Sequence, residues 1–204
     1  MLPAWRWPLR HYRPEAISIN QKSADKVPIK AYKDKLPIIG KGVFIDETAT
    51  VIGDVALGDD VSIWPATVLR GDVNRIEIGA RTNIQDGSVL HVTHGGEHSP
   101  GGYPLLVGDD VTIGHRVVLH GCRIGNHCLI GIGAVVMDGA VIQDEVILGA
   151  GSLVPPGRTL ESGFLYIGSP ARKARPLTTE EKVFFRYSAK HYVSLKNDYS
   201  VFNI

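Results

Sequence analysis

Residues 124–154 read IGNHCLIGIGAVVMDGAVIQDEVILGAGSLV. An aliphatic residue recurs in it at every sixth position: Ile124, Ile130, Val136, Ile142, Leu148 and Val154. A helix with about 3.6 residues per turn cannot keep such a repeat on one face for long. Short strands joined by tight turns can keep it, because Gly, Asp and Asn tolerate the turn dihedrals. The stretch therefore predicts a stack of short strands.

The same register continues upstream. Its aliphatic positions there are Leu57, Ile63, Leu69, Ile78, Ile84, Leu90, Val107, Ile113 and Leu119. This is the hexapeptide-repeat pattern of a parallel β-helix, in which stacked coils share one continuous core. Resemblance to hexapeptide-repeat proteins implies, in addition, a left-handed winding with three hexads per coil. A glycine-rich insertion at 93–102 interrupts the register and predicts a loop that bulges from the stack.

The repeat divides the chain into three parts. We assign residues 36–176 to a left-handed β-helix domain and residues 1–35, which follow no period, to an irregular N-terminal extension of unassigned role. Residues 177–200 are predicted to form a C-terminal α-helix packed along the coils, because a capping box at 178–181 precedes aromatic residues at helical spacing. The predicted fold is therefore mainly β with one helix.

The composition excludes several classes of protein. With 22 Lys and Arg against 21 Asp and Glu, the net charge of +1 gives no electrostatic reason to expect a nucleic-acid or membrane partner. No apolar run approaches the roughly 18 residues of a spanning helix. Cys122 and Cys128 fall at inward positions and are expected to be buried and reduced. Because no export signal is recognisable, we expect a cytoplasmic protein.

The register places three histidines where they could be metal ligands. Leu90 and Leu119 lie one coil apart, so His91 and His120, which follow them, point outward and stack at the ~4.8 Å spacing of neighbouring strands. At this spacing a ring nitrogen of each histidine can bind the same metal ion, with bonds of roughly 2.0–2.1 Å. His115 lies on the preceding face and cannot easily reach this pair. If it is a ligand, it should come from a neighbouring subunit, which predicts a homotrimer with the metal between subunits.

Polar side chains surround these positions. The residues that the register gathers around the proposed site are Arg70, Asp72, Asn83, Gln85 and Asp86. In the insertion, His94, Glu97 and His98 are either solvated loop residues or groups that relay protons above a metal.

At these positions the sequence resembles the gamma-class carbonic anhydrases, most closely their compact bacterial members. The likeness covers roughly residues 32–199. The runs that carry it are Arg70-Gly71-Asp72, Asn83-Ile84-Gln85-Asp86-Gly87-Ser88, Leu90-His91, Gly114-His115 and Leu119-His120-Gly121-Cys122.

The resemblance implies roles for individual residues. The ligands of a Zn2+ ion, or of Fe2+ or Co2+, would be His91, His115 and His120. Gln85 would hydrogen-bond the metal-bound water, Asn83 would share its pocket, and Tyr166 would match a tyrosine near the active site. The residues that would form salt bridges across the trimer interface are Arg70, Asp72 and Asp86.

The first functional hypothesis is a carbonic anhydrase, a lyase in which a metal-bound hydroxide hydrates CO2 reversibly to bicarbonate. The insertion lacks the acidic cluster of the archetypal enzyme, so Glu97 or His94 would have to relay the proton. One alternative is a metal-binding homologue with little CO2 hydration or with an unknown substrate. The other is a coenzyme A-dependent hexapeptide acyltransferase, which needs only one general-base histidine.

Overall fold

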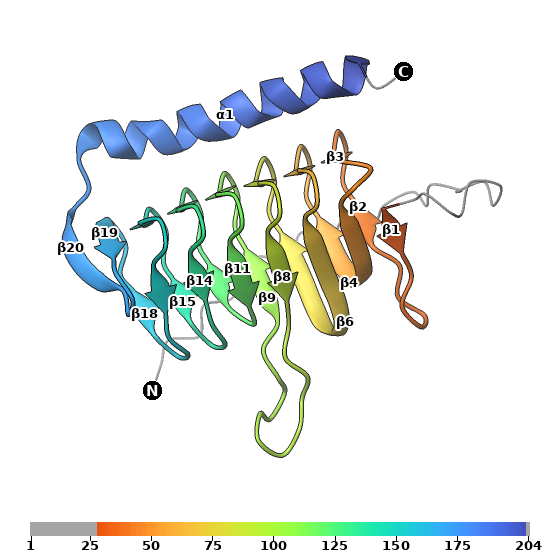
Figure 1. The fold of residues 1–204 in the computed structure, drawn as a ribbon, viewed down its shortest axis with the longest axis horizontal. Coiled ribbons are helices and arrows are strands. Elements are labelled where there is room, and N and C mark those ends of the chain that lie inside the picture. Colours follow the sequence, from red (N-terminus) through yellow and green to blue (C-terminus); the bar gives the residue numbers. More distant parts are fainter. Residues whose placement is uncertain (1–27, 203–204) are drawn as a thin grey trace.

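The structure, a computed structural model, describes residues 28–202. Its strands wind into a parallel β-helix with three faces, and one helix runs along the stack (Figure 1). The first face contains the first halves of β4 (Thr50–Leu57) and β6 (Val68–Ile78), with β1 (Ile29–Lys30), β8 (Val89–His91), β11 (Val118–His120), β14 (Val135–Val136) and β17 (Leu153–Val154).

The remaining strands form the other two faces. The second face contains the second halves of β4 and β6, with β2 (Ile38–Ile39), β9 (Leu105–Val107), β12 (Arg123–Ile124), β15 (Val141–Ile142) and β18 (Thr159–Leu160). The third face contains β3 (Phe44–Ile45), β5 (Ser62–Ile63), β7 (Asn83–Ile84), β10 (Thr112–Ile113), β13 (Leu129–Ile130), β16 (Ile147–Leu148), β19 (Phe164–Ile167) and β20 (Arg172–Pro176). Neighbouring strands within each face pair in parallel, except β19 with β20, which are antiparallel.

The six-residue repeat forms the core. Leu90 stacks on Leu119 and Ile84 on Ile113, and all four side chains are fully buried. Each coil thus covers the apolar surface of the next, which is the favourable term that holds a solenoid together. The predicted parallel β-helix with a C-terminal helix is confirmed.

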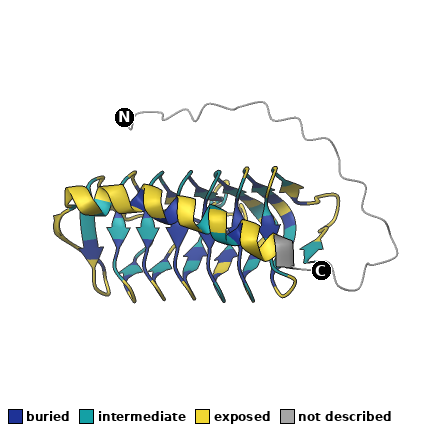
Figure 2. Ribbon diagram, turned by 90° about the horizontal axis from the view of Figure 1, so that it is seen from above, coloured by how far each residue is buried: buried dark blue, intermediate teal, exposed yellow. Residues whose placement is uncertain are grey.

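The helix α1 (Thr179–Phe202) lies lengthwise over the third face (Figure 2). Its start is a capping box: the Glu181 amide donates to the Thr178 hydroxyl, and the Thr178 amide donates to the Glu181 carboxylate. Its docked side includes Phe185, Ser188 and Lys196, whose ammonium lies 3.0 Å from Asp60. None of the described helices is long and apolar enough to cross a membrane.

The chain departs from the predicted boundaries at its start. Strand β1 pairs with β4, so regular structure begins inside the segment that we assigned to the extension. Residues 1–27 of that segment lie outside the described residues. Between β8 and β9, the insertion leaves the stack as a long projecting loop (Figure 1).

Candidate metal centre

His91 and His120 lie side by side on the first face. They are register partners on β8 and β11, and Nδ1 of His91 lies 3.0 Å from Nε2 of His120. Two nitrogens bound to one tetrahedral Zn2+ at 2.0–2.1 Å are ~3.3 Å apart. The spacing of the pair therefore fits two ligands of one ion after a small movement.

Each of the three candidate ligands has a carboxylate on its other ring nitrogen. His91 Nε2 lies 3.0 Å from Asp72, His115 Nδ1 lies 2.9 Å from Asp86, and His120 Nδ1 lies 2.6 Å from Asp138. A carboxylate on one nitrogen fixes the tautomer and turns the other nitrogen toward a metal. Three such pairs are the arrangement expected of metal-binding histidines.

The electrostatics of the His91–Asp72 pair favour a neutral ring beside an ionised carboxylate. Burial lowers the pKa of His91 and outweighs the opposing effect of Asp72. Burial raises the pKa of Asp72, but hydrogen bonds from Arg70 and His91 outweigh it and leave that pKa lowered. Metal ligation requires the neutral imidazole.

The third candidate ligand lies elsewhere in the chain. His115 follows β10 at a corner of the third face, beside Asp86 on the coil below. Within the described part of one chain, no three His, Cys, Asp or Glu side chains are close enough together to hold a metal ion. The structure thus separates the predicted site into a first-face group and a third-face group.

The third-face group also contains the predicted polar pocket. Gln85 Nε2 donates to Asn83 Oδ1 at 3.1 Å, and both side chains are buried. In the first-face group, Arg70 donates to Asp72 at 2.5 Å within the same chain. Salt bridges of Arg70, Asp72 and Asp86 across a subunit interface stay predictions.

Two functional candidates were missed by the sequence reasoning. Asp138 bonds His120, and the Thr93 hydroxyl donates to the other carboxylate oxygen at 2.9 Å. The register does contain a signal, because Asp138 follows Met137, the position that stacks one coil beyond His120.

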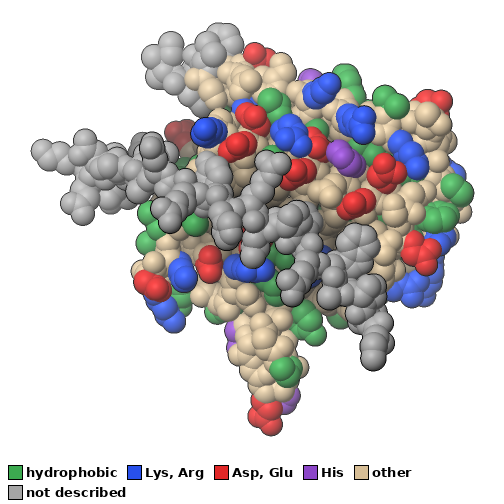
Figure 3. Space-filling view, turned by 180° about the vertical axis from the view of Figure 1, so that it is seen from behind, with side chains coloured by type: hydrophobic (Ala, Val, Ile, Leu, Met, Phe, Trp, Pro, Cys, Tyr) green, Lys and Arg blue, Asp and Glu red, His purple; other side chains and the backbone are tan. Residues whose placement is uncertain are grey.

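The loop residues and Tyr166 are not brought to the histidine pair. His94 and Glu97 are exposed, and among the described residues neither side chain hydrogen-bonds His91 or His120. Histidine and acidic side chains occupy the end of the projecting loop (Figure 3).

The expectation for Tyr166 needs correction. It is a buried core residue at an inward position, stacked on Leu148, and its hydroxyl accepts a hydrogen bond from the Glu161 amide. The ring of Tyr192 on α1 packs edge-on against Trp64, with centroids 5.8 Å apart, and lies within the electrostatic reach of Asp86 in the third-face group. Burial, and secondarily the charge of Asp86, raises the pKa of Tyr192.

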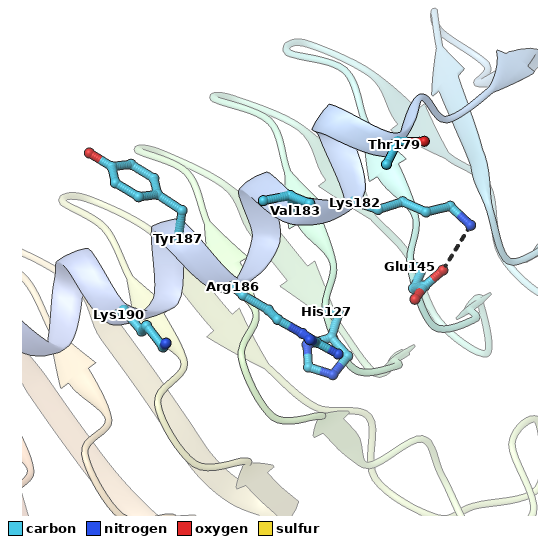
Figure 4. Close-up of a pocket in the computed structure, with 8 residues that line it drawn as sticks. All are labelled: His127, Glu145, Thr179, Lys182, Val183, Arg186, Tyr187 and Lys190. Carbon is cyan, nitrogen blue, oxygen red and sulfur yellow. Dashed lines mark ion pairs between the residues drawn. The ribbon is translucent and has the colours of Figure 1, made fainter.

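A groove of about 500 Å³ runs between α1 and the turns that carry His127 and Glu145 (Figure 4). Lys182 crosses it to form an ion pair with Glu145 at 3.2 Å. None of the three candidate ligand histidines lines this groove. It is therefore a feature of helix docking and not part of the candidate metal centre.

The chain is similar to several known proteins. The family described as "Bacterial transferase hexapeptide (six repeats)" matches residues 121–156. Protein YrdA of Escherichia coli is 57% identical over 84% of this chain and 93% of its own length. The "Probable carbonic anhydrase" of Methanocaldococcus jannaschii is 41% identical over 78% of this chain and 95% of its own.

Two further comparisons bear on the fold and the family. Mitochondrial gamma carbonic anhydrase 2 of Arabidopsis thaliana is 44% identical over 79% of this chain and 58% of its own length. The crystal structure of a hexapeptide transferase family protein from Anaplasma phagocytophilum superposes with a TM-score of 0.77 at 41% identity. That comparison covers 84% of this chain and 97% of the other.

Proposed function

The chain belongs to the hexapeptide-repeat family that includes YrdA, and we propose from this premise that it is a gamma-class carbonic anhydrase, which hydrates CO2 reversibly to bicarbonate. The observation that carries the proposal is the set of three histidines, each bonded to an aspartate through one ring nitrogen. An acyltransferase that uses a histidine as general base has no need of three such pairs.

The ligands we propose are His91 and His120 of one chain and His115 of its neighbour. A Zn2+, Fe2+ or Co2+ ion held by three neutral imidazoles lowers the pKa of water toward neutrality and so supplies a nucleophile for CO2. The carboxylates of Asp72, Asp86 and Asp138 hold the rings in the tautomer that leaves one nitrogen free. Gln85, held by Asn83, provides the neighbouring hydrogen-bonding group.

The homotrimer is supported by the surface beside the histidine pair. An outward row of aliphatic side chains crosses the first face, each one position before a buried leucine or valine: Val68, Val89, Val118, Val135 and Leu153. Val89 is 41% exposed in the single chain. An apolar row next to a polar site is typical of an interaction surface. We propose that it receives the neighbour's corner with His115.

One observation favours the second candidate, a metal-binding protein with little turnover. The proton released by hydration must reach solvent, and neither Glu97 nor His94 hydrogen-bonds the histidine pair within the described chain. If this loop does not approach the site of a neighbouring subunit, only buffer molecules can accept the proton, and this proton transfer limits the rate.

Stopped-flow CO2 hydration, with protein loaded in turn with Zn2+ and, anaerobically, with Fe2+, tests the proposal. We expect a metal-dependent rate above that of buffer, lost in His115→Ala. Stoichiometrically bound metal without such a rate would overturn the carbonic anhydrase proposal and favour the second candidate. Full metal content and activity in His115→Ala would show that the intersubunit site is wrong. Saturable binding of acetyl-coenzyme A would favour the acyltransferase.

A further inference from the structure

A row of four buried polar side chains connects the candidate site to the C-terminal helix. Gln85 donates to Asn83, Asn83 Nδ2 donates to the Thr112 hydroxyl at 3.0 Å, and that hydroxyl lies 2.7 Å from the Ser188 hydroxyl of α1. At most 7% of the surface of any of these residues is exposed. The row begins at Gln85, next to Asp86 and His115, and ends on a different structural element.

The donor and acceptor directions of the hydrogen bonds in this row are fixed. Asn83 Nδ2 also faces the carbonyl oxygen of Val111, at 3.4 Å, and a carbonyl can only accept. The Asn83 amide must therefore point its NH2 group toward Thr112 and its oxygen toward Gln85. Gln85 then turns its own NH2 group inward, and its Oε1 is left outside the row as an acceptor.

Helix docking alone does not require these polar groups. Further along the same outward column, under the same helix, the positions that follow Thr112 are Leu129 and Ile147. Buried polar groups cost free energy unless they are fully paired, whereas apolar side chains would dock the helix as well. The column is polar on three successive coils: at Ser62, whose hydroxyl accepts a hydrogen bond from Trp64 Nε1, and then at Asn83 and Thr112, on the coils that carry Gln85 and His115.

We propose that Thr112 and Ser188 are positioning residues that hold Asn83, and through it Gln85, with the Gln85 Oε1 presented to the site as a hydrogen-bond acceptor. This inference rests on the proposed function, because Gln85 is the only member of the row placed in the reaction. It makes α1 part of the site, acting through Ser188, although no residue of the helix is a metal ligand. The reaction would need the Gln85 side-chain amide in one orientation, because an amide free to rotate would present an acceptor and a donor to the site in turn.

Isosteric variants test the row. Thr112→Val replaces the hydroxyl with a methyl group of similar size, and Thr112→Ser keeps the hydroxyl. Ser188→Ala removes the helix end of the row, and its matched control is Ser194→Ala, at an exposed position of the same helix. The first readout is the side-chain amide NMR signals of Asn83 and Gln85 in metal-free protein, identified by their loss in Asn83→Asp and Gln85→Glu. The second is kcat and KM for CO2 in metal-loaded protein.

We expect Thr112→Val and Ser188→Ala to move or broaden both amide signals and to lower kcat about fivefold, as the loss of one hydrogen bond predicts, with little change in KM. Thr112→Ser and Ser194→Ala should match wild type in both readouts. Unmoved amide signals in Thr112→Val would overturn the proposal. A Thr112→Ser variant as impaired as Thr112→Val would also overturn it, because packing would then be the cause.

The amide readout does not depend on the proposed reaction. If wild-type protein shows no metal-dependent hydration while the amide signals respond as expected, the proposed function fails and the positioning of Gln85 by α1 still holds. If hydration is present and kcat is unchanged in Thr112→Val, the positioning role fails and the proposed function stands.

Discussion

The carboxylate of Asp138 lies 2.6 Å from Nδ1 of His120, on the next coil of the stack, and the Thr93 hydroxyl holds its other oxygen. A carboxylate held on both sides has little freedom to turn away. It fixes the orientation of the ring through one nitrogen while the other faces His91.

Asp138→Asn should therefore weaken metal binding by about 10–100-fold, the usual effect of losing a carboxylate that supports a metal-bound histidine. Competition with a chromophoric chelator measures the affinity. The control is Glu145→Gln, which alters an acidic side chain that is paired with Lys182 and lies away from the three candidate ligands. Equal affinities of Asp138→Asn and wild type would show that the carboxylate does not support a ligand.

A subunit mixing experiment tests the shared site. His115→Ala and His120→Ala should each lose bound metal, since each removes one of three proposed ligands. Co-refolding the two variants at equal amounts creates trimers in which one site combines intact ligands from both. By cyclic symmetry and random mixing, about one quarter of the sites should regain metal. Metal analysis after gel filtration measures this, and no recovery in mixed trimers would contradict the arrangement.

Val89→Lys should prevent assembly. The side chain is 41% exposed in one chain, so a lysine there is tolerated by the monomer, but it would place a charge in the proposed apolar interface. Analytical ultracentrifugation should report a folded monomer without stoichiometric metal. Val141→Lys, an outward position on the second face, is the matched control and should remain trimeric. A trimeric Val89→Lys protein would mean that the interface lies elsewhere.

The start of α1 should show a defined pH dependence. Hydrogen bonds from Arg175, and then from the Thr178 amide, lower the pKa of Glu181 to about 2 from its usual 4.5. A depressed carboxyl pKa stabilises the folded state above the unfolded pKa, and this contribution is lost as the pH falls from about 4.5 toward 2. Glu181→Gln should therefore lower the Tm at pH 7, with a difference from wild type that shrinks below pH 4.5.

Thermal unfolding followed by circular dichroism at pH 7, 4.5 and 3.5 checks this. Glu97→Gln, at the exposed loop, is the control and should leave the Tm unchanged at each pH. A Tm difference for Glu181→Gln that stays constant with pH would show that the ionised carboxylate is not the stabilising group.

The hexad count was enough to place some site residues and not others. Counting from Leu90 to Leu119 pairs His91 with His120, because the strand spacing of a solenoid is constant and the structure has the same register. The same count could have corrected Tyr166, which occupies an inward position in line with Leu148. The motif match identified the tyrosine but contained no information on burial.

Contacts between side chains of different coils or elements could not be predicted from the sequence alone. The register places Asp138 one residue after the position that stacks on His120, but the bond to His120 also needs a rotamer that bridges two coils, which a register does not specify. Helical spacing indicates which side of α1 docks, but not which coil lies beneath a given turn, so the Ser188–Thr112 contact could not be foreseen. Both depend on distances between elements that the local pattern leaves free.

The length of α1 has a consequence for how the molecule unfolds. A solenoid held only by contacts between successive coils frays from its ends, one repeat at a time. Here the helix begins at β20 and reaches Asp60 beside β5 through Lys196, so it spans most of the array (Figure 1). Loss of either terminal coil would first require the helix to undock. The helix thus links the two ends of the array, so that they open cooperatively rather than independently.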